Sequence, residues 1–174
     1  MEDPLAHLAA AAAEGNNSAL EALVLETRQA VTRVCVQLGS PGETDDLVQE
    51  TYLRMVRALP GFRAEAPILA WLLTIARRTC ADQVRRRERS RRIDARVRAE
   101  PIDHVTPPPE YTDDLLDAID PDRRDAFVLT QIAGLSYADA AAQLRCPVGT
   151  IRSRVARARD DLRALVEPQD AEAS

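Results

Sequence analysis

The stretch GLSYADAAAQLRCPVGTIRSRVARAR, residues 134–159, carries the pattern of two short helices joined by a tight break. Ser136 is predicted to cap the first helix, and an acidic residue three positions later completes most of a capping box. The segment 146–149, CPVG, interrupts the pattern, and Thr150 is predicted to begin the second helix. One face of that helix is aliphatic and therefore predicted to be buried: it holds Ile151, Val155, Ala158 and Leu162.

The opposite face of the second helix is basic and small. This arrangement is typical of a helix-turn-helix, whose second helix presents its exposed N-terminal residues to the major groove of DNA. Arginine there binds a guanine through two hydrogen bonds or a phosphate through one. An ordinary helical hairpin with a solvated basic face is the alternative for this stretch. The residues predicted to contact DNA are Thr150, Arg152, Ser153 and Arg157.

The composition favours an all-α fold. The chain has 174 residues, of which 45% are hydrophobic and 3% aromatic, a length that suits one domain or two small ones. Alanine, leucine and arginine dominate, and no segment alternates as a half-buried strand does. All 23 basic residues are arginine, whose planar guanidinium suits phosphates and guanines.

Charge is sorted along the chain. Residues 61–98 hold eleven arginines and four acidic residues, a net charge of +7, and residues 126–166 carry +3. The segment 99–125 between them carries −7, although the whole chain is only −5. Two basic blocks are what phosphate binding requires, whereas a merely solvated face more often mixes the signs.

The segment 99–112, AEPIDHVTPPPEYT, contains four prolines and no helical period. Three consecutive prolines favour an extended, stiff chain. We therefore expect two helical domains, at residues 1–98 and 113–167, joined by this Pro-rich acidic linker and followed by a tail at 168–174.

Five further helices are expected. In the first domain they run from about residue 17 or 18 to 38, from 44 or 45 to 59, and onward from Pro67. In the second domain they cover residues 113–119 and 121–133, ahead of the helix-turn-helix.

The helix at 45–59 has one apolar face, with Leu47, Thr51, Met55 and Leu59, which is predicted to be buried. On the opposite face Leu53 lies among polar residues. An isolated exposed leucine usually has no role, but one inside a polar rim also fits the centre of a partner site. The rim consists of Asp46, Gln49, Glu50, Arg54 and Arg57.

The helix after Pro67 is predicted to bury a stripe formed by Ile68, Leu72, Ile75, Ala76 and Thr79. A neighbouring stripe is rich in arginine and suits a phosphate track, and the loop 61–66 before it is placed to hold a single-stranded base. Trp71 lies on this stripe, although its side chain is expected to be part of the core. The other members are Arg78, Asp82, Arg85 and Arg89.

Several classes of function are not supported. Cys35, Cys80 and Cys146 are far apart in the sequence, and neither His7 nor His104 lies near a cysteine, so we expect reduced thiols, no disulfide framework and no metal. No cofactor site, nucleophile–histidine pair, catalytic carboxylate pair or phosphate-binding glycine loop is recognisable, and an enzyme is not expected. No signal peptide or membrane span is recognised, so we expect a cytoplasmic protein without a membrane partner.

Three quoted stretches carry a family resemblance. DDLVQETYLRMVRALPGFR and AWLLTIARRTCADQVRRR resemble region 2 of bacterial extracytoplasmic-function (group IV) sigma factors of the sigma-70 family, and LTQIAGLSYADAAAQLRCPVGTIRSRVARARDDL resembles region 4. Together they cover about two thirds of the chain, in the family's order. The region 4 stretch is most similar to the actinobacterial sigma factor C group. The chain departs from common family residues at Arg78, often asparagine, and at Ala64, often glycine.

The resemblance implies an alternative sigma factor that binds core RNA polymerase and promoter DNA, without a cofactor. The β′ clamp helices and the β flap of polymerase are the implied contacts, and the short ending EPQDAEAS favours control in trans by an anti-sigma factor. The implied polymerase contacts are Asp46, Gln49, Glu50, Leu53 and Arg54. The implied minus-10 contacts are Phe62, Arg63, Ala64, Glu65, Ala66, Arg77, Arg78, Asp82 and Arg85, and region 4 is implied to read the minus-35 element.

A stand-alone helix-turn-helix regulator is the alternative function. It explains residues 126–166 but gives no purpose to the surface of residues 45–59. A regulator of that kind binds duplex DNA alone, whereas a sigma factor requires core polymerase and then opens the DNA.

Overall fold

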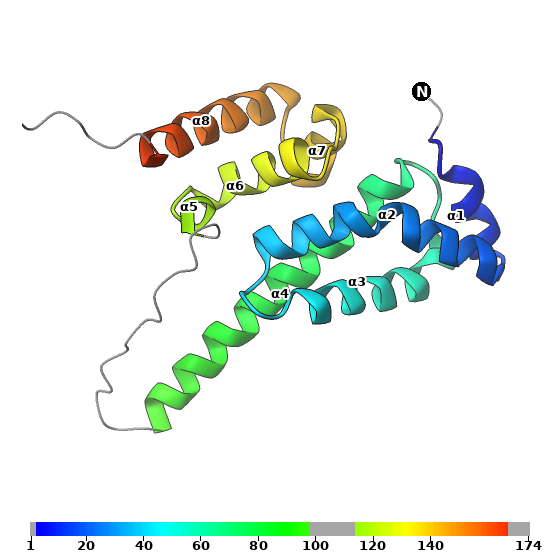
Figure 1. Ribbon diagram of the computed structural model, residues 1–174, viewed down its shortest axis with the longest axis horizontal. Coiled ribbons are helices and arrows are strands. Elements are labelled where there is room, and N and C mark those ends of the chain that lie inside the picture. Colours follow the sequence, from blue (N-terminus) through cyan, green and yellow to red (C-terminus); the bar gives the residue numbers. More distant parts are fainter. Residues whose placement is uncertain (1–2, 98–113, 167–174) are drawn as a thin grey trace, which may run out of the picture. The chain divides into compact units, whose positions relative to one another are not determined.

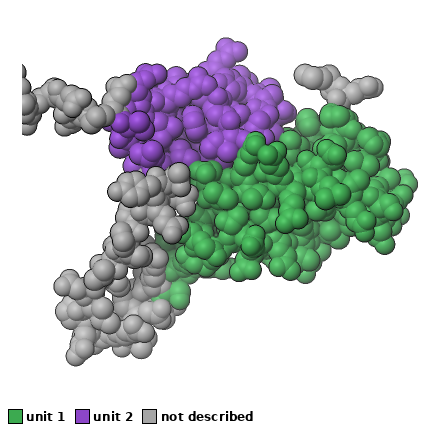
Figure 2. Space-filling model, viewed as in Figure 1, with its two compact units in different colours: residues 1–105 green, residues 106–174 purple. Residues whose placement is uncertain are grey.

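Every regular element in the described residues, 3–97 and 114–166 of this computed structural model, is a helix. The expected all-α class is confirmed. The chain divides into two units, residues 1–105 and 106–174, which Figure 2 shows in different colours. The predicted linker, 99–112, and the predicted tail, 168–174, lie outside the described residues.

The described part of the first unit, residues 3–97, contains four α-helices and one short 3₁₀ turn. Helix α1 spans Ala6–Ala13, α2 spans Asn17–Leu38 and α3 spans Thr44–Ala58. The 3₁₀ turn η1 covers Leu59–Gly61, and α4 covers Ile68–Val97. Helices α2, α3 and α4 pack against one another, α1 packs against α2, and α4 extends beyond the other helices (Figure 1).

The core of this unit follows the predicted faces of α3 and α4. Leu47, Thr51, Met55 and Leu59 are all buried, as predicted. On α4 the prediction is confirmed for Ile68, Leu72, Ala76 and Thr79, but Ile75 is only half-buried because Leu73 and Cys80 occupy the interior beside the stripe.

The ends of the helices differ from the predictions at several points. Helix α1 was not expected, because a run of alanines has no distinct apolar face. Asn16, rather than Asn17 or Ser18, caps α2 by accepting a hydrogen bond from the amide of Ala19 at 3.1 Å. Glu43 occupies the N-cap position of α3 without a side-chain capping bond.

Two buried contacts join α2 to its neighbours. The thiols of Cys35 on α2 and Cys80 on α4 are hydrogen-bonded, which lowers the pKa of the Cys35 thiol against the opposing effect of burial. A Cβ at Gly39 would collide with the Leu47 side chain and with the carbonyl oxygen of Cys35. Glycine at that position lets the end of α2 approach the start of α3.

The second unit contains the helix-turn-helix. Helix α5 spans Asp114–Asp117, α6 spans Pro121–Phe127 and the π-helical turn η2 spans Val128–Ile132. Helix α7 covers Tyr137–Leu144 and α8 covers Val148–Val166. Helix α8 packs against both α6 and α7 (Figure 1), which buries Ile151, Val155 and Ala158 as predicted, whereas Leu162 is only half-buried.

The two helices expected before the helix-turn-helix have bounds that differ from the prediction. The helix expected at residues 121–133 changes to a π-helical turn at Val128, where the amide of Ala133 donates to the carbonyl of Val128 at 2.8 Å. The expected helix at 113–119 is reduced to the single turn of α5. A hydrogen bond from residue i to residue i−5, as in the π-helical turn η2, leaves no mark in the apolar pattern. The sequence therefore could not reveal that turn.

Helix α8 begins at Val148, two residues before the predicted start at Thr150. The carbonyl of Pro147 accepts hydrogen bonds from the amides of Thr150 and Ile151, so the first turn includes Gly149. The packing of α8 therefore outweighs the low helix propensity of glycine. The predicted cap of α7 is confirmed, because Ser136 accepts from the amide of Asp139 at 3.1 Å.

Candidate functional site

Three polar contacts fasten α8 to α6 and η2 without using its outward face. They turn two arginines of α8 inward, toward the body of the second unit, while an arginine of α6 reaches the C-terminal half of α8. The three pairs are Arg154 with Asp122, Arg159 with Gln131, and Arg123 with Asp161, the last at 2.8 Å.

The outward face of α8 presents two exposed arginines near its N-terminal end. Arg152, Ser153 and Arg157 are exposed near the N-terminal end of α8, and Thr150 is half-buried. Neither Arg152 nor Arg157 has a hydrogen-bond or ion-pair partner among the described residues. The hydroxyl of Ser153 donates to the carbonyl of Thr150 at 2.9 Å. This face therefore combines two unengaged guanidinium groups with small side chains, which suits the major groove.

In the first unit, the loop between η1 and α4 is held at both ends. The ring of Phe62 lies against the ring of Trp71, with centroids 5.0 Å apart. The carboxylate of Asp3 accepts the amide hydrogen of Ile68 at 2.7 Å and so caps the start of α4. Trp71 is half-buried, so it packs at the base of this loop instead of in the deep core.

The middle of this loop is exposed. Ala64 has a φ of +53°, a left-handed conformation that disfavours residues with a Cβ. Its neighbours Arg63, Glu65 and Ala66 are also exposed, and Phe62 is half-buried. The loop thus exposes the short side chains of Ala64 and Ala66 together with the charged side chains of Arg63 and Glu65, next to the paired rings of Phe62 and Trp71.

Helix α4 carries the arginine-rich stripe that follows the loop. Arg78 and Arg85 are exposed, whereas Arg77 and Asp82 are half-buried. Residues 85–87 are three consecutive arginines. Arg78, Arg85 and Arg89, spaced seven and four residues apart, are exposed on one side of α4.

The outward face of α3 has an apolar centre. Leu53 exposes 46% of its surface and Val56 exposes 44%. Asp46 and Gln49 are exposed beside them. Val56 was not among the predicted contacts, although its spacing of three from Leu53 places both on one helix surface and was the signal available.

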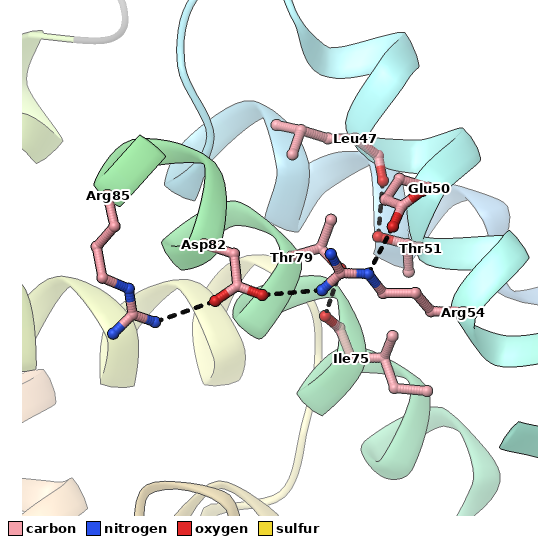
Figure 3. Close-up of polar contacts among 8 residues, drawn as sticks. All are labelled: Leu47, Glu50, Thr51, Arg54, Ile75, Thr79, Asp82 and Arg85. Atoms are coloured by element: carbon pink, nitrogen blue, oxygen red, sulfur yellow. Dashed lines mark hydrogen bonds and ion pairs between the residues drawn. The ribbon is translucent and has the colours of Figure 1, made fainter. Parts of the chain in front are cut away.

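The remaining two predicted polymerase contacts, Glu50 and Arg54, turn toward α4 instead. The Nε of Arg54 donates to Glu50 Oε1 at 2.7 Å, and its Nη1 donates to Asp82 Oδ2 at 3.0 Å. The other oxygen of Asp82, Oδ1, accepts from Arg85 Nη2 at 3.3 Å (Figure 3). The structure thus connects residues predicted for two different partners.

These ion pairs shift the pKa values of Arg54 and Asp82 in opposite directions. The carboxylates of Glu50 and Asp82 raise the pKa of the Arg54 guanidinium. In turn Arg54, and to a smaller extent Arg85, lowers the pKa of the Asp82 carboxyl below its ordinary value. Both groups are therefore held in their charged forms at neutral pH.

Residues 3–97 and 114–166 contain neither a metal-binding cluster nor a membrane-spanning helix. Within them no cluster of three His, Cys, Asp or Glu side chains is placed to hold a metal ion. In the same ranges no helix has both the length and the hydropathy needed to cross a bilayer.

Comparison with known families places both units. Residues 23–90 match the family described as Sigma-70 region 2, and residues 110–162 match Sigma-70, region 4. The first match includes the outward face of α3 and most of the arginine stripe of α4. The second includes the helix-turn-helix.

Full-length relatives and solved structures agree with these matches. The chain is 44% identical to the ECF RNA polymerase sigma factor SigC of Mycobacterium tuberculosis, over 97% of this chain and 95% of that protein. It is 30% identical to the ECF RNA polymerase sigma-E factor of Escherichia coli K12, over 89% and 90% of the two chains.

Among solved structures, CnrH in complex with the cytosolic domain of CnrY matches with a TM-score of 0.72 at 34% identity, covering 95% of this chain and 97% of that one. The sigma factor RpoE of Bartonella quintana, solved with the anti-sigma factor NepR, matches with a TM-score of 0.70 at 31% identity, covering 86% and 97%. All three stretches that carried the resemblance lie within these matches, and the similarity to one family extends along nearly the whole chain. The protein belongs to the extracytoplasmic-function sigma factors of the sigma-70 family.

Proposed function

We propose that this sigma factor recruits core RNA polymerase through the outward face of α3 and directs it to promoters through α4 and α8. In this scheme the β′ clamp helices cover the apolar centre formed by Leu53 and Val56, with Asp46 and Gln49 at its rim. The β flap is the expected second contact of polymerase, and we infer that the protein acts in the cytoplasm.

The loop 62–66 and the stripe of α4 are proposed to bind the minus-10 element as a separated strand. A nucleobase that leaves the duplex can be held between the alanines of the loop and the aromatic rings of Phe62 and Trp71. The exposed arginines of α4 would follow the phosphates of that strand. In region 4, Arg152 and Arg157 are proposed to read the minus-35 element as duplex, with Thr150 and Ser153 as smaller contacts.

The observation that carries the proposal is the apolar patch on α3. A protein that only binds DNA has no use for two exposed aliphatic side chains inside a polar rim, one helix away from its arginine stripe. An interface with a second protein does have such a centre. No group of this chain is assigned a chemical step.

An anti-sigma partner is also proposed, because a structural neighbour, the RpoE factor of Bartonella quintana, was solved with one. Such a partner would act by covering the same surfaces that polymerase or DNA requires.

The test is run-off transcription with purified core polymerase on a library of promoter fragments. We expect specific transcripts only when both core polymerase and this protein are present. If transcripts do not depend on the protein, while the protein alone binds duplex DNA with high affinity, the stand-alone regulator is the correct function.

A further inference from the structure

Figure 3 shows a continuous line of polar contacts from α3 to the outer side of α4. It runs from Glu50 through Arg54 and Asp82 to Arg85. Three of these residues, Glu50, Arg54 and Asp82, line a groove at the seam of the two helices. Beneath it the seam is closed by buried side chains, including Thr51 and Thr79, whose hydroxyls donate to carbonyls of their own helices at 2.7 and 2.9 Å.

Arg54 is directed to this seam and not to the apolar patch. Its Nε and Nη1 are both engaged, and its side chain exposes only 29% of its surface. The contact with Glu50 is one turn back on the same helix, which fixes the direction in which the guanidinium extends. A partner on the outward face of α3 would thus meet Leu53 but not the engaged nitrogens of Arg54.

Both carboxylate oxygens of Asp82 are engaged within the protein. Each oxygen accepts from a different arginine, one on α3 and one on α4. A negative charge on a DNA-facing stripe also opposes phosphate binding. Its position is explained if it holds the guanidinium of Arg85 and fastens α4 to α3.

We propose that Arg54 and Asp82 are positioning residues that couple the polymerase-binding helix to the promoter-reading helix, and that neither is itself a contact to polymerase or DNA. The proposal rests on the proposed function and replaces the roles that the resemblance implied for these two residues. A second ion pair on the same seam, between Glu43 at the start of α3 and Arg87 on α4, supports a coupling role for this edge.

The test is a double-mutant cycle with Arg54→Gln, Asp82→Asn and the double variant. Core binding is measured by fluorescence titration. Promoter opening is measured by permanganate reactivity at saturating holoenzyme, on a promoter selected in the run-off library. Saturation separates opening from polymerase affinity. Circular-dichroism melting confirms that every variant is folded at the assay temperature.

We expect each single variant to bind core polymerase like the wild type and to open the promoter about two- to fivefold less, the range of one partly exposed ion pair. The double variant should open the promoter no less than the less active single variant does, because both substitutions remove the same interaction. Matched controls are Glu88→Gln for the loss of an acid on α4 and Arg28→Gln for the loss of an arginine on α2. Both residues are exposed.

A second cycle, which pairs Leu53→Ala with Asp82→Asn, supplies the contrasting case. Promoter opening is then measured at subsaturating holoenzyme, where the losses caused by the two substitutions should multiply. The proposal is overturned if the losses of the Arg54 and Asp82 variants also multiply, or if Arg54→Gln weakens core binding as much as Leu53→Ala does. A wild-type protein that does not associate with core polymerase would instead reject the proposed function before the cycle is measured.

Discussion

Replacing Leu53 with aspartate tests the polymerase surface on α3. Leu53 exposes 46% of its surface, and full burial of a leucine side chain is worth about 1.5–3 kcal/mol. Covering the exposed half of the Leu53 side chain in an interface therefore contributes about 1 kcal/mol to the binding free energy. An unpaired carboxylate at the same place would lose this term, and it would also have to shed water at a cost of several kcal/mol.

These terms together amount to about 3 kcal/mol or more, which corresponds to a loss of affinity of about 100-fold. The fold itself should tolerate the change, because exposed substitutions usually alter the free energy of unfolding by about 0.5 kcal/mol or less. The assay is a fluorescence titration of labelled protein with core polymerase, together with a melting curve for each variant.

The matched control is Leu25→Asp on α2, since Leu25 is 72% exposed and the chemical change is the same. We expect this control to bind core polymerase like the wild type. The reasoning is refuted if Leu53→Asp binds within threefold of the wild type, or if the two aspartate variants lose the same affinity.

Four further predictions concern promoter reading and stability. Arg157→Ala should keep core binding but weaken binding to minus-35 duplex by about 1–3 kcal/mol if the contact is to a base, measured by competition between promoter variants; equal weakening on every sequence would indicate a phosphate contact instead. Ala64→Gly should raise the free energy of unfolding by about 0.5–1 kcal/mol, because the relieved left-handed strain exceeds the entropy that glycine loses on folding; a lower melting temperature would contradict this. Asp3→Ala should lower that free energy by about 1 kcal/mol through loss of the α4 cap, and unchanged denaturant unfolding would show that the cap is unimportant. Because Arg54 lowers the pKa of Asp82, the pair stabilises the fold above the unfolded carboxyl pKa and ceases to do so as pH falls through the folded value, so wild type and Asp82→Asn should differ in melting temperature at about pH 7 and converge once the pH is below the folded pKa of Asp82.

Features that depend on local pattern could be predicted from the sequence. The buried side of α8 at Ile151, Val155 and Ala158 follows from spacing alone, as does the exposed position of Leu53. The Ser136 cap of α7 likewise depends on residues three positions apart. In each case one helix contains all the information, since helical geometry converts spacing directly into direction.

Features that join distant segments could not be predicted in this way. Asp3 caps a helix that begins 65 residues later, and no local signal connects the two. The pairing of Arg54 with Asp82 and the contact of Cys35 with Cys80 depend on how α2, α3 and α4 are packed. Family resemblance indicated which surfaces matter, but it assigned Arg54 and Asp82 to separate partners because only the packed helices show that they meet.

The most direct measurement of the central claim uses a fluorescent promoter fragment and three samples: the protein alone, core polymerase alone, and both together. We predict that only the mixture binds the fragment specifically and makes thymines of the minus-10 element reactive to permanganate. Specific binding and opening by the protein without core polymerase, or no opening when both are present on a promoter that the library selects, would contradict the account.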